Sequence, residues 1–426
     1  MLIEFRTANC LSFKEMAEFS MLASKDKTNE DSNTFLVNGT RFLKSAAIYG
    51  ANGSGKTNFV QAIDFMRDLV LGISPVRDYT YRLDKTMKDE PSFFEIIFIK
   101  DDKRYRYGFE LSRKSVLSEW LFYVPTTRET ILFTREKQNI TIGRSFKEGK
   151  VLSDSVKSDK LFLSFVAQLD GAKIAQSIIE WFKDMSVMSG LDSDVSDTVN
   201  ILSEKGKSGE KRKRQVLDIL HRFDIQIEDI TIKERDFVPL VPPSDSDMSD
   251  QMKVVIESLN TLMEKEGGGK MPPQVVTHRK TYENGKESGL EEFDLQRYES
   301  DGTKKLFALA GSLAQSLETG QTIVVDELES KLHPLVTKEI VKLFNSKISN
   351  KKNAQLIFTT HDTNLLQGNH FRRDQIWFTE KDKFGSSHLY SLLEYKPRKD
   401  ASFQKDYING RYGAIPYIGD FNSLIG

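Results

Sequence analysis

The sequence predicts an α/β fold in which a β-sheet surrounds a phosphate-binding loop and its helix, with a helical segment inserted in this domain. The first observation is the stretch Gly50–Thr57, which reads GANGSGKT and satisfies the pattern G-x-x-x-x-G-K-[ST] in full. The second is the pair Asp326 and Glu327, which directly follows the apolar run Thr322–Val325. The third is the helical spacing of apolar residues through residues 161–223.

Composition sets the limits within which these motifs operate. The chain has 426 residues, 38% of them hydrophobic and 29% charged, which is typical of a globular protein with one large core and a subsidiary module. Its net charge of -1 favours neither nucleic acid nor a membrane as a partner. Cys10 is the single cysteine, which excludes an internal disulfide and a multi-cysteine metal site. With Glu4 and Arg6 where a signal peptide would be apolar, we expect a cytoplasmic protein without membrane contact.

The loop at residues 50–57 lies between a strand-like run, Ala46–Tyr49, and a run with helical periodicity that begins at Phe59. Backbone N–H groups of such a loop surround phosphate oxygens, and the helix that follows directs its positive end at the same anion. Lys56 is expected at the terminal phosphates, and Thr57 at a Mg²⁺ ion. The remaining residues expected to contact the nucleotide are Asn52, Gly53, Ser54 and Gly55.

Short strand-like runs fill the first 50 residues, and FFEIIFIKDDKRYRYGFEL then predicts a hairpin of two strands, 93–100 and 104–111. Helical spacing follows from Leu161, without a sustained heptad repeat. We therefore expect three segments. Residues 1–155 form the first half of the nucleotide-binding head, 156–273 a compact helical insert with polar loops, and 274–426 the second half of the head.

The acidic strand supplies the carboxylates for metal binding and water activation, which the loop lacks. An apolar strand that ends in Asp-Glu is typical of ATPases, in which the aspartate holds the water shell of Mg²⁺ and the glutamate deprotonates the attacking water. Asp326 is expected in the first role and Glu327 in the second.

A strongly helical run, opened by Ser300, Asp301 and Gly302, precedes the acidic strand. Ser300 can be an ordinary helix cap. Alternatively, Ser300 and Gly302 grip the terminal phosphate of a nucleotide held by a second subunit. The order of a capped helix followed by the acidic strand is that of ABC-type heads and favours the second reading. The predicted fold class is therefore an α/β ABC-type P-loop ATPase head, a mixed β-sheet around the P-loop helix, with a compact, mainly helical insert.

The strand AQLIFTTH ends at His361, after the acidic strand. ABC-type heads place a histidine that senses the terminal phosphate at this point, so we expect His361 to be a switch residue.

Taken together, GANGSGKT, ESDGTKKL, VVDELESKLHP, AQLIFTTHD, RRDQIWF and GRYGAIP resemble the AAA-type ATPases of the SMC, RecF and OLD branch. Within it the sequence is most similar to small stand-alone ATPases of bacterial abortive-infection and anti-phage operons. The resemblance spans residues 1 to about 130 and 275–416. It implies the roles given above for Lys56, Thr57, Asp326, Glu327 and His361, and for the signature Ser300 and Gly302.

The resemblance also implies that Gln168 contributes to the Mg²⁺ site and couples the insert to it. It implies ATP and Mg²⁺ as cofactors, a homodimer or higher homo-oligomer closed through the ATP sites, and a separately encoded toxin or nuclease as the controlled effector. Two features depart from the branch. The signature reads Ser300-Asp301-Gly302 in place of Ser-Gly-Gly, and no long coiled coil is present.

Two other functions deserve comparison. A nuclease is suggested by Glu329-Ser330-Lys331, but this string follows the acidic strand directly, where a nuclease would need it on a strand of its own. Nucleic-acid binding, as in an SMC- or RecF-like ATPase of DNA repair or maintenance, is suggested by the basic stretch from Lys205 to Arg214. The latter remains the alternative function.

Overall fold

The computed structural model describes residues 1–125, 128–153, 155–190, 194–204, 206–237, 239–240, 250–266, 270–368, 370–398 and 401–417. It contains two compact units. The first combines Met1–Leu191 with Gln315–Gly426, and the second is Asp192–Ala314.

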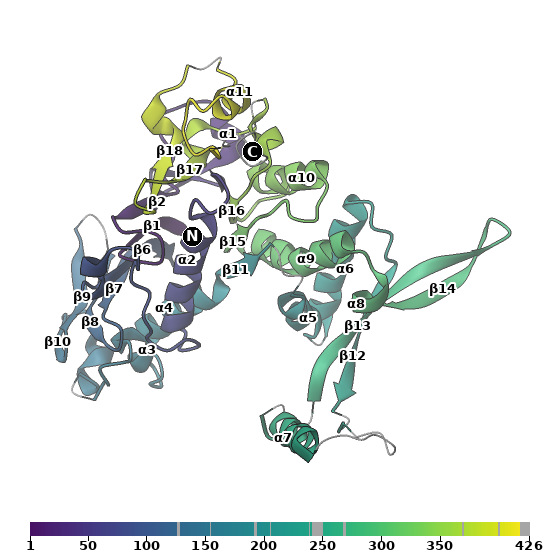
Figure 1. Cartoon of the computed structure of the whole chain (residues 1–426), viewed down its shortest axis with the longest axis horizontal. Helices are drawn as coiled ribbons and strands as arrows, with labels where there is room; N and C mark the ends of the chain where they lie inside the picture. Colours follow the sequence, from purple (N-terminus) through teal and green to yellow (C-terminus); the bar gives the residue numbers. More distant parts are fainter. Residues whose placement is uncertain are drawn as a thin grey trace, which may run out of the picture. The chain divides into compact units, whose positions relative to one another are not determined.

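A six-stranded sheet forms the centre of the first unit (Figure 1). Its strands are parallel except for the last, which is antiparallel to its neighbour. Three of them, β15, β16 and β5, are buried at every residue, as expected of parallel strands covered on both faces. In spatial order the strands are β11 (Ser186–Ser189), β15 (Thr322–Asp326), β16 (Gln355–Thr359), β5 (Ser45–Tyr49), β17 (Ile376–Lys381) and β18 (Ser387–Ser391).

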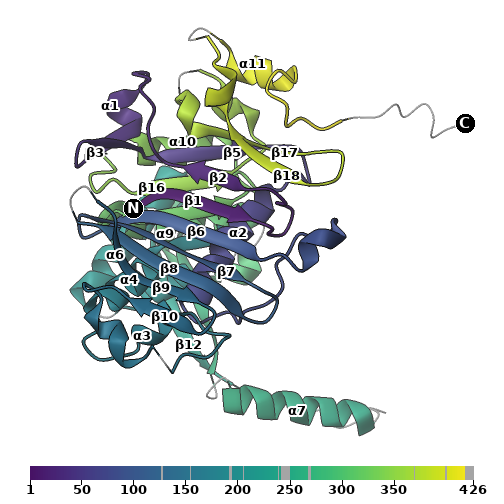
Figure 2. The same ribbon diagram turned by 90° about the vertical axis from the view of Figure 1, so that its left-hand side faces the viewer.

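A seven-stranded antiparallel sheet completes the first unit, and Figure 2 shows β1, β6, β7 and β8 as neighbours in it. The predicted hairpin of residues 93–111 is confirmed as β6 and β7. In spatial order the strands are β10 (Asn139–Ile142), β9 (Thr130–Glu136), β8 (Val116–Val124), β7 (Lys103–Leu111), β6 (Ser92–Lys100), β1 (Leu2–Ala8) and β2 (Ala17–Ser20). A separate pair joins β3 (Thr34–Val37) to β4 (Thr40–Leu43).

Helix α2 (Lys56–Val70) joins the two sheets through one hydrophobic core. Phe59 of this helix packs edge-on against Phe5 of β1, and the same core includes Val324 of β15 and Ile357 of β16. The helix therefore carries the phosphate loop at its N-terminal end, and both sheets hold the rest of the helix in place. The other helices of this unit are α1 (Glu30–Asn33), α3 (Phe162–Val166), α4 (Lys173–Asp184), α10 (Pro334–Asn345) and α11 (Phe403–Ile408).

The second unit combines helices with a three-stranded antiparallel sheet. The Thr198 hydroxyl joins α5 to α9 because it donates to the carbonyl of Phe307 or Ala308, at 3.0 and 2.9 Å. The elements are α5 (Ser196–Leu202), α6 (Lys207–Arg222), β12 (Asp229–Asp236), α7 (Asp250–Glu266), β13 (Lys270–Glu283), β14 (Lys286–Asp294), α8 (Leu295–Tyr298) and α9 (Asp301–Thr319), whose last residues belong to the first unit.

The structure divides the chain at other residues than the predicted insert, 156–273. Strand β11 lies within that range yet pairs with β15 in the central sheet. The hairpin of β13 and β14 runs past residue 273 and was not predicted (Figure 1). Its second strand is exposed along most of its length, so the sequence there lacks the alternation of apolar and polar residues that identifies a half-buried strand.

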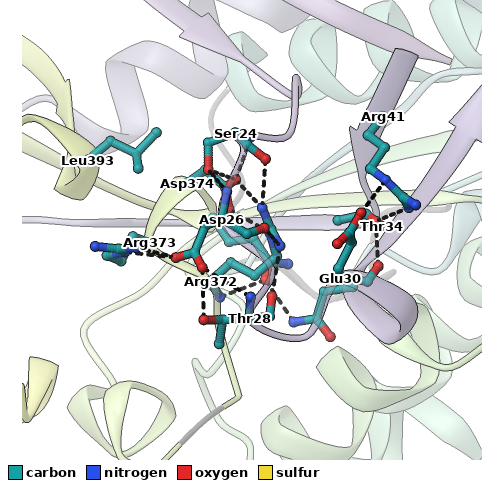
Figure 3. Close-up of polar contacts among 12 residues, drawn as sticks. Ser24, Asp26, Thr28, Glu30, Thr34, Arg41, Arg372, Arg373, Asp374 and Leu393 are labelled. Atoms are coloured by element: carbon teal, nitrogen blue, oxygen red, sulfur yellow. Dashed lines mark hydrogen bonds and ion pairs between the residues drawn. The ribbon is translucent and has the colours of Figure 1, made fainter. Parts of the chain in front are cut away.

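A buried polar network fastens the N-terminal part of the chain to the segment after β16 (Figure 3). The Arg372 guanidinium, fully buried, makes two hydrogen bonds to Asp374 and also donates to the carbonyls of Asp26 and Thr28. Next to it, Arg373 donates to Asp26 Oδ2 at 2.6 and 2.8 Å. Every charge in this network has a partner of opposite charge, which offsets part of the cost of burying it, and removing one partner would leave the other charge uncompensated.

Asp26 makes the stability of this network dependent on pH. Partial burial raises the pKa of Asp26, but the Thr28 N–H and the Arg373 guanidinium outweigh it and bring the pKa down to about 2. Because the folded-state pKa lies below the unfolded value of about 3.9, the stabilisation is complete above pH 4 and is lost as the pH falls through about 2.

We expect Asp26→Asn to lower the free energy of unfolding by about 1–2 kcal/mol at pH 7. The difference from wild type should shrink as the pH is lowered towards 3, which urea denaturation at several pH values would measure. Asp31→Asn is the matched control, since the Asp31 side chain is 96% exposed and forms a surface ion pair with Lys347. A difference that stays constant from pH 7 to pH 3 would contradict the assignment.

Candidate functional site

The site lies where three neighbouring parallel strands end. Strand β5 leads into the loop at Gly50, β15 ends at Asp326, and β16 ends at Thr359. The carboxyl ends of parallel strands share one edge of the sheet, which is where α/β proteins bind ligands. His361 lies two residues beyond the end of β16, where the sequence expected the strand itself to reach it.

Hydroxyl groups of the neighbouring strands β17 and β18 hold the phosphate loop in shape. Ser54 Oγ lies 2.7 Å from Thr379 Oγ1 of β17, and Ser387 of β18 donates to the Ser54 carbonyl at 2.7 Å. Gly53 and Gly55 have φ of 73° and 114°, which disfavour residues with a side chain. A Cβ at Gly55 would also come within 2.3 Å of Ser387 Oγ, so glycine is required there for contact as well as conformation.

Lys56 is buried beneath this loop and is held by it. Its Nζ donates to the carbonyl oxygens of Gly50 at 2.9 Å and Ala51 at 3.2 Å. Burial lowers the pKa of Lys56, whereas the nearby carboxylates, first Asp326 and then Glu327, oppose this shift. The ammonium group is thus already placed inside the curve of the loop, next to the acidic strand end.

The two acidic residues are fixed by one hydroxyl group. Thr359 Oγ1 donates to Asp326 Oδ1 at 2.6 Å and accepts from the N–H of Glu327 at 2.7 Å. Glu327 has a φ of 49°, in the left-handed region that a residue with a side chain adopts only under constraint. The chain therefore turns at the end of β15, leaving Asp326 buried and Glu327 partly accessible.

These residues fit a Mg²⁺ ion bound together with a nucleotide. Within the described part of the chain, no group of three or more His, Cys, Asp or Glu side chains could hold a metal by itself. Mg²⁺ in nucleotide sites takes one or two carboxylates and completes its shell with phosphates and water. Buried Asp326 and the exposed Thr57, at the start of α2, are the ligands such an ion would use.

His361 belongs to the same site. Partial burial and the Lys56 ammonium lower the pKa of His361, against the opposing effect of Glu329, Glu327 and Asp326. At neutral pH its imidazole is therefore mainly uncharged and can donate one N–H and accept at the other nitrogen.

Ser300 and Gly302 lie in the second unit, at the start of α9. Ser300 Oγ accepts the Thr303 N–H at 3.2 Å and lies 2.9 Å from Thr303 Oγ1, so Ser300 does cap this helix. Asp301 pairs with Lys304 at 3.8 Å. The capping contact does not decide whether the same residues also receive a phosphate.

Gln168 lies outside the cluster that the loop and the acids form. It follows α3, whose Ser164 hydroxyl donates to the carbonyl of Val70, the last residue of α2. Thr57 lies at the opposite end of that helix, about 20 Å away at the usual rise of an α-helix. The Gln168 side chain is exposed and the structure does not bring it to Thr57.

Several contributing residues carried no signal in the sequence. Thr359 and Ser387 are ordinary polar residues whose partners are distant in the chain, at Asp326 and Ser54. The C-terminal stretch Tyr407–Tyr417 supplies one wall of a cavity of about 930 Å³ that also borders the phosphate loop and His361. The GRYGAIP motif of this stretch points to a family by resemblance, but its residue types alone indicate no contact with the loop.

Three basic residues of the stretch that suggested nucleic-acid binding form ion pairs on α6. Arg212 pairs with Glu204, Lys213 with Asp229 at 2.6 Å and Arg214 with Glu210 at 3.8 Å. Lys205, where the stretch begins, lies outside the described residues. Basic side chains that are already paired with carboxylates attract the phosphate groups of nucleic acids less strongly.

Among the described residues, none of the helices combines the length and the apolar character that crossing a bilayer requires.

We expect Thr359→Val to lower the free energy of unfolding by about 1–3 kcal/mol, because it leaves the Glu327 N–H and one Asp326 oxygen without a partner. Nucleotide affinity should fall in the presence of Mg²⁺ and change less without it. Thr359→Ser retains the hydroxyl and is the matched control, with a cost of about 1 kcal/mol for the lost methyl group. Urea denaturation and titration with a fluorescent nucleotide provide both measurements, and equal behaviour of the two variants would contradict the role of the hydroxyl.

Comparisons with known proteins give one family and several similar structures. Residues 45–367 match the family described as AAA domain, putative AbiEii toxin, Type IV TA system. The SMC head domain from Thermotoga maritima is similar to the chain with a TM-score of 0.42 and 13% identity, and the match covers 92% of this chain and 98% of that one. An Smc head bound to the C-winged helix domain of ScpA is similar with a TM-score of 0.42 and 15% identity, and the match covers 93% of this chain and 99% of that one. Among curated proteins, none is similar enough to count as a match. Since the matched residues span more than half of the chain and contain the loop, the acidic strand and His361, the protein belongs to this family of AAA domains.

Proposed function

We propose that this protein hydrolyses ATP with Mg²⁺ and acts as a dimeric switch that controls a separate effector in anti-phage defence. The observation that carries the first part is that Lys56 lies near Asp326 and Glu327, the two acids that Thr359 joins at the end of β15. A loop that binds phosphate without a nearby acid pair would serve binding alone. The presence of both in one site favours hydrolysis.

Each residue then has a distinct task. Backbone N–H groups of residues 53–57 and the start of α2 receive the phosphates, and Lys56 neutralises their charge. Thr57 and Asp326 hold Mg²⁺, which withdraws charge from the phosphate oxygens when bound. Glu327 orients the attacking water and accepts its proton. His361, mainly uncharged, donates a hydrogen bond towards the terminal phosphate.

The switch and its effector rest on the family rather than on the site. In the branch that the sequence resembles, ATP closes two heads over shared sites and hydrolysis reopens them. The family description, which names a putative AbiEii toxin and a type IV toxin–antitoxin system, supports a role in such a system. The separate effector rests on the resemblance seen in the sequence. A cytoplasmic location follows from that role. The alternative, an SMC- or RecF-like ATPase acting on DNA, is weakened by the ion pairs of α6, and an ATPase rate that rises with added DNA or RNA would revive it.

Glu327→Gln should retain nucleotide binding and reduce the rate of ATP hydrolysis by about 10²–10⁴, since the amide keeps the shape of the carboxylate but cannot accept a proton. A phosphate-release assay and nucleotide titration measure the two effects. Lys56→Ala is the contrasting variant and should weaken binding itself. Wild-type hydrolysis by Glu327→Gln would refute the assignment of the base.

The proposed dimer predicts complementation between two defective subunits. Lys56→Ala chains mixed with Ser300→Arg chains form heterodimers in which both lesions fall on one site and the other site is intact. ATPase activity should therefore rise above that of either pure variant, after incubation long enough for subunit exchange. A mixture no more active than the sum of its parts, with exchange shown by mass spectrometry, would return Ser300 to the role of a simple helix cap.

A further inference from the structure

Glu329 is the third acidic residue of the stretch Asp326–Glu329 and has no task in the mechanism above. Its Oε1 accepts a hydrogen bond from the backbone N–H of His361. Because Glu329 follows β15 and His361 follows β16, this contact joins the segment that carries the base to the segment that carries the histidine.

The backbone around Glu329 holds its carboxylate in this position. The positive φ of Glu327 turns the chain, and the next residue, Leu328, is fully buried with its N–H bonded to the Thr359 carbonyl at 3.1 Å. The chain closes again through the Leu332 N–H, which donates to the Glu329 carbonyl at 2.9 Å. Glu329 is thus presented by a tight, internally bonded turn rather than by a free loop.

His361 is held at its backbone by this contact. Within the part of the chain that the structure describes, its imidazole makes no hydrogen bond, and the hydrogen bond of its own residue is that of the N–H to Glu329. The preceding residue is fixed as well, since the Thr360 N–H donates to the Ile48 carbonyl at 3.0 Å. On the other side of the His361 Cα, the Asp362 N–H donates to Thr360 Oγ1 at 3.0 Å. Together these backbone contacts limit the directions in which the ring can reach.

The second oxygen of Glu329 argues against a role in stability alone. Oε2 is buried and finds no donor among the described residues. A buried polar atom without a partner costs stability, so stability alone does not explain this arrangement. The Glu329 carboxylate also lies close enough to Lys56 and His361 to influence the pKa of both.

From this geometry we infer that Glu329 is a positioning residue, which holds the main chain of His361 so that the imidazole meets the terminal phosphate while Glu327 faces the attacking water. The inference rests on the proposed function and adds to it a direct connection between the base and the switch histidine.

Two variants of Glu329 separate positioning from other roles. Glu329→Ala removes the acceptor for the His361 N–H and should lower kcat about tenfold or more, with KM for ATP changed less than threefold, because a displaced group costs rate more than binding. Glu329→Gln keeps an oxygen acceptor and should retain at least half of wild-type kcat. Glu339→Ala, which removes an exposed carboxylate paired with Lys342 on α10, is the control and should behave as wild type.

The contact itself can be observed without turnover. The chain has six histidines, so selective ¹⁵N labelling gives six histidine amide signals, and His361→Gln identifies the one of interest. In nucleotide-free wild type and Glu329→Gln this amide proton should resonate downfield and exchange slowly. In Glu329→Ala it should move upfield and exchange faster, while the melting temperature shows that the variant is folded.

The results of these experiments distinguish failure of the inference from failure of the proposed function. Normal kcat in Glu329→Ala, or an unchanged His361 amide, would overturn the inference. Loss of kcat in Glu329→Gln equal to that in Glu329→Ala would also overturn it, since the charge and not the contact would then matter. If wild type hydrolyses no ATP, the proposed function fails, and the amide spectra still decide whether Glu329 holds His361.

Discussion

The hydroxyl group of Thr359 stands between the two acidic residues and binds both, donating to the side chain of one and accepting from the backbone of the other. It belongs to β16, whereas the acids belong to β15, so the site depends on the register between these two strands. A slip of one residue would turn the hydroxyl to the opposite face and leave a buried carboxylate unpaired. The full burial of both strands makes such a slip costly, and in this way the core determines the chemistry at its edge.

The phosphate loop shows the same dependence on distant strands. Its glycines permit the curve, but Thr379 and Ser387, from the strands beyond β5, hold the curve in place. Lys56 completes it from inside, since its ammonium group bonds two carbonyls of the loop. A nucleotide therefore meets a loop that is already bent, which lowers the conformational entropy lost on binding.

The sequence predicted those parts of the site whose function dictates residue types at fixed spacing. Gly50–Thr57 and Asp326-Glu327 are such parts, because backbone curvature and metal binding tolerate few alternatives. It could not predict Thr359, Ser387 or Glu329, since a hydroxyl or carboxylate with a distant partner looks like any surface residue. The hairpin β13–β14 was missed for a related reason: strands exposed to water lack an apolar pattern. Gln168, expected at the metal by resemblance alone, lies by the other end of α2.

The contacts of the first strand have a consequence for biosynthesis. The backbone of Leu2 is bonded on both sides by the Gln355 side chain, and the segment around Asp26 needs Arg372 and Arg373. These partners leave the ribosome only when most of the chain has been made. The apolar face of β1 can meet α2 and β6 soon after synthesis, but these backbone and polar groups must wait for their partners through the synthesis of some 300 residues, at an elongation rate of about 5–20 residues per second. A nascent chain in that interval is incompletely folded and is therefore a natural substrate for chaperones.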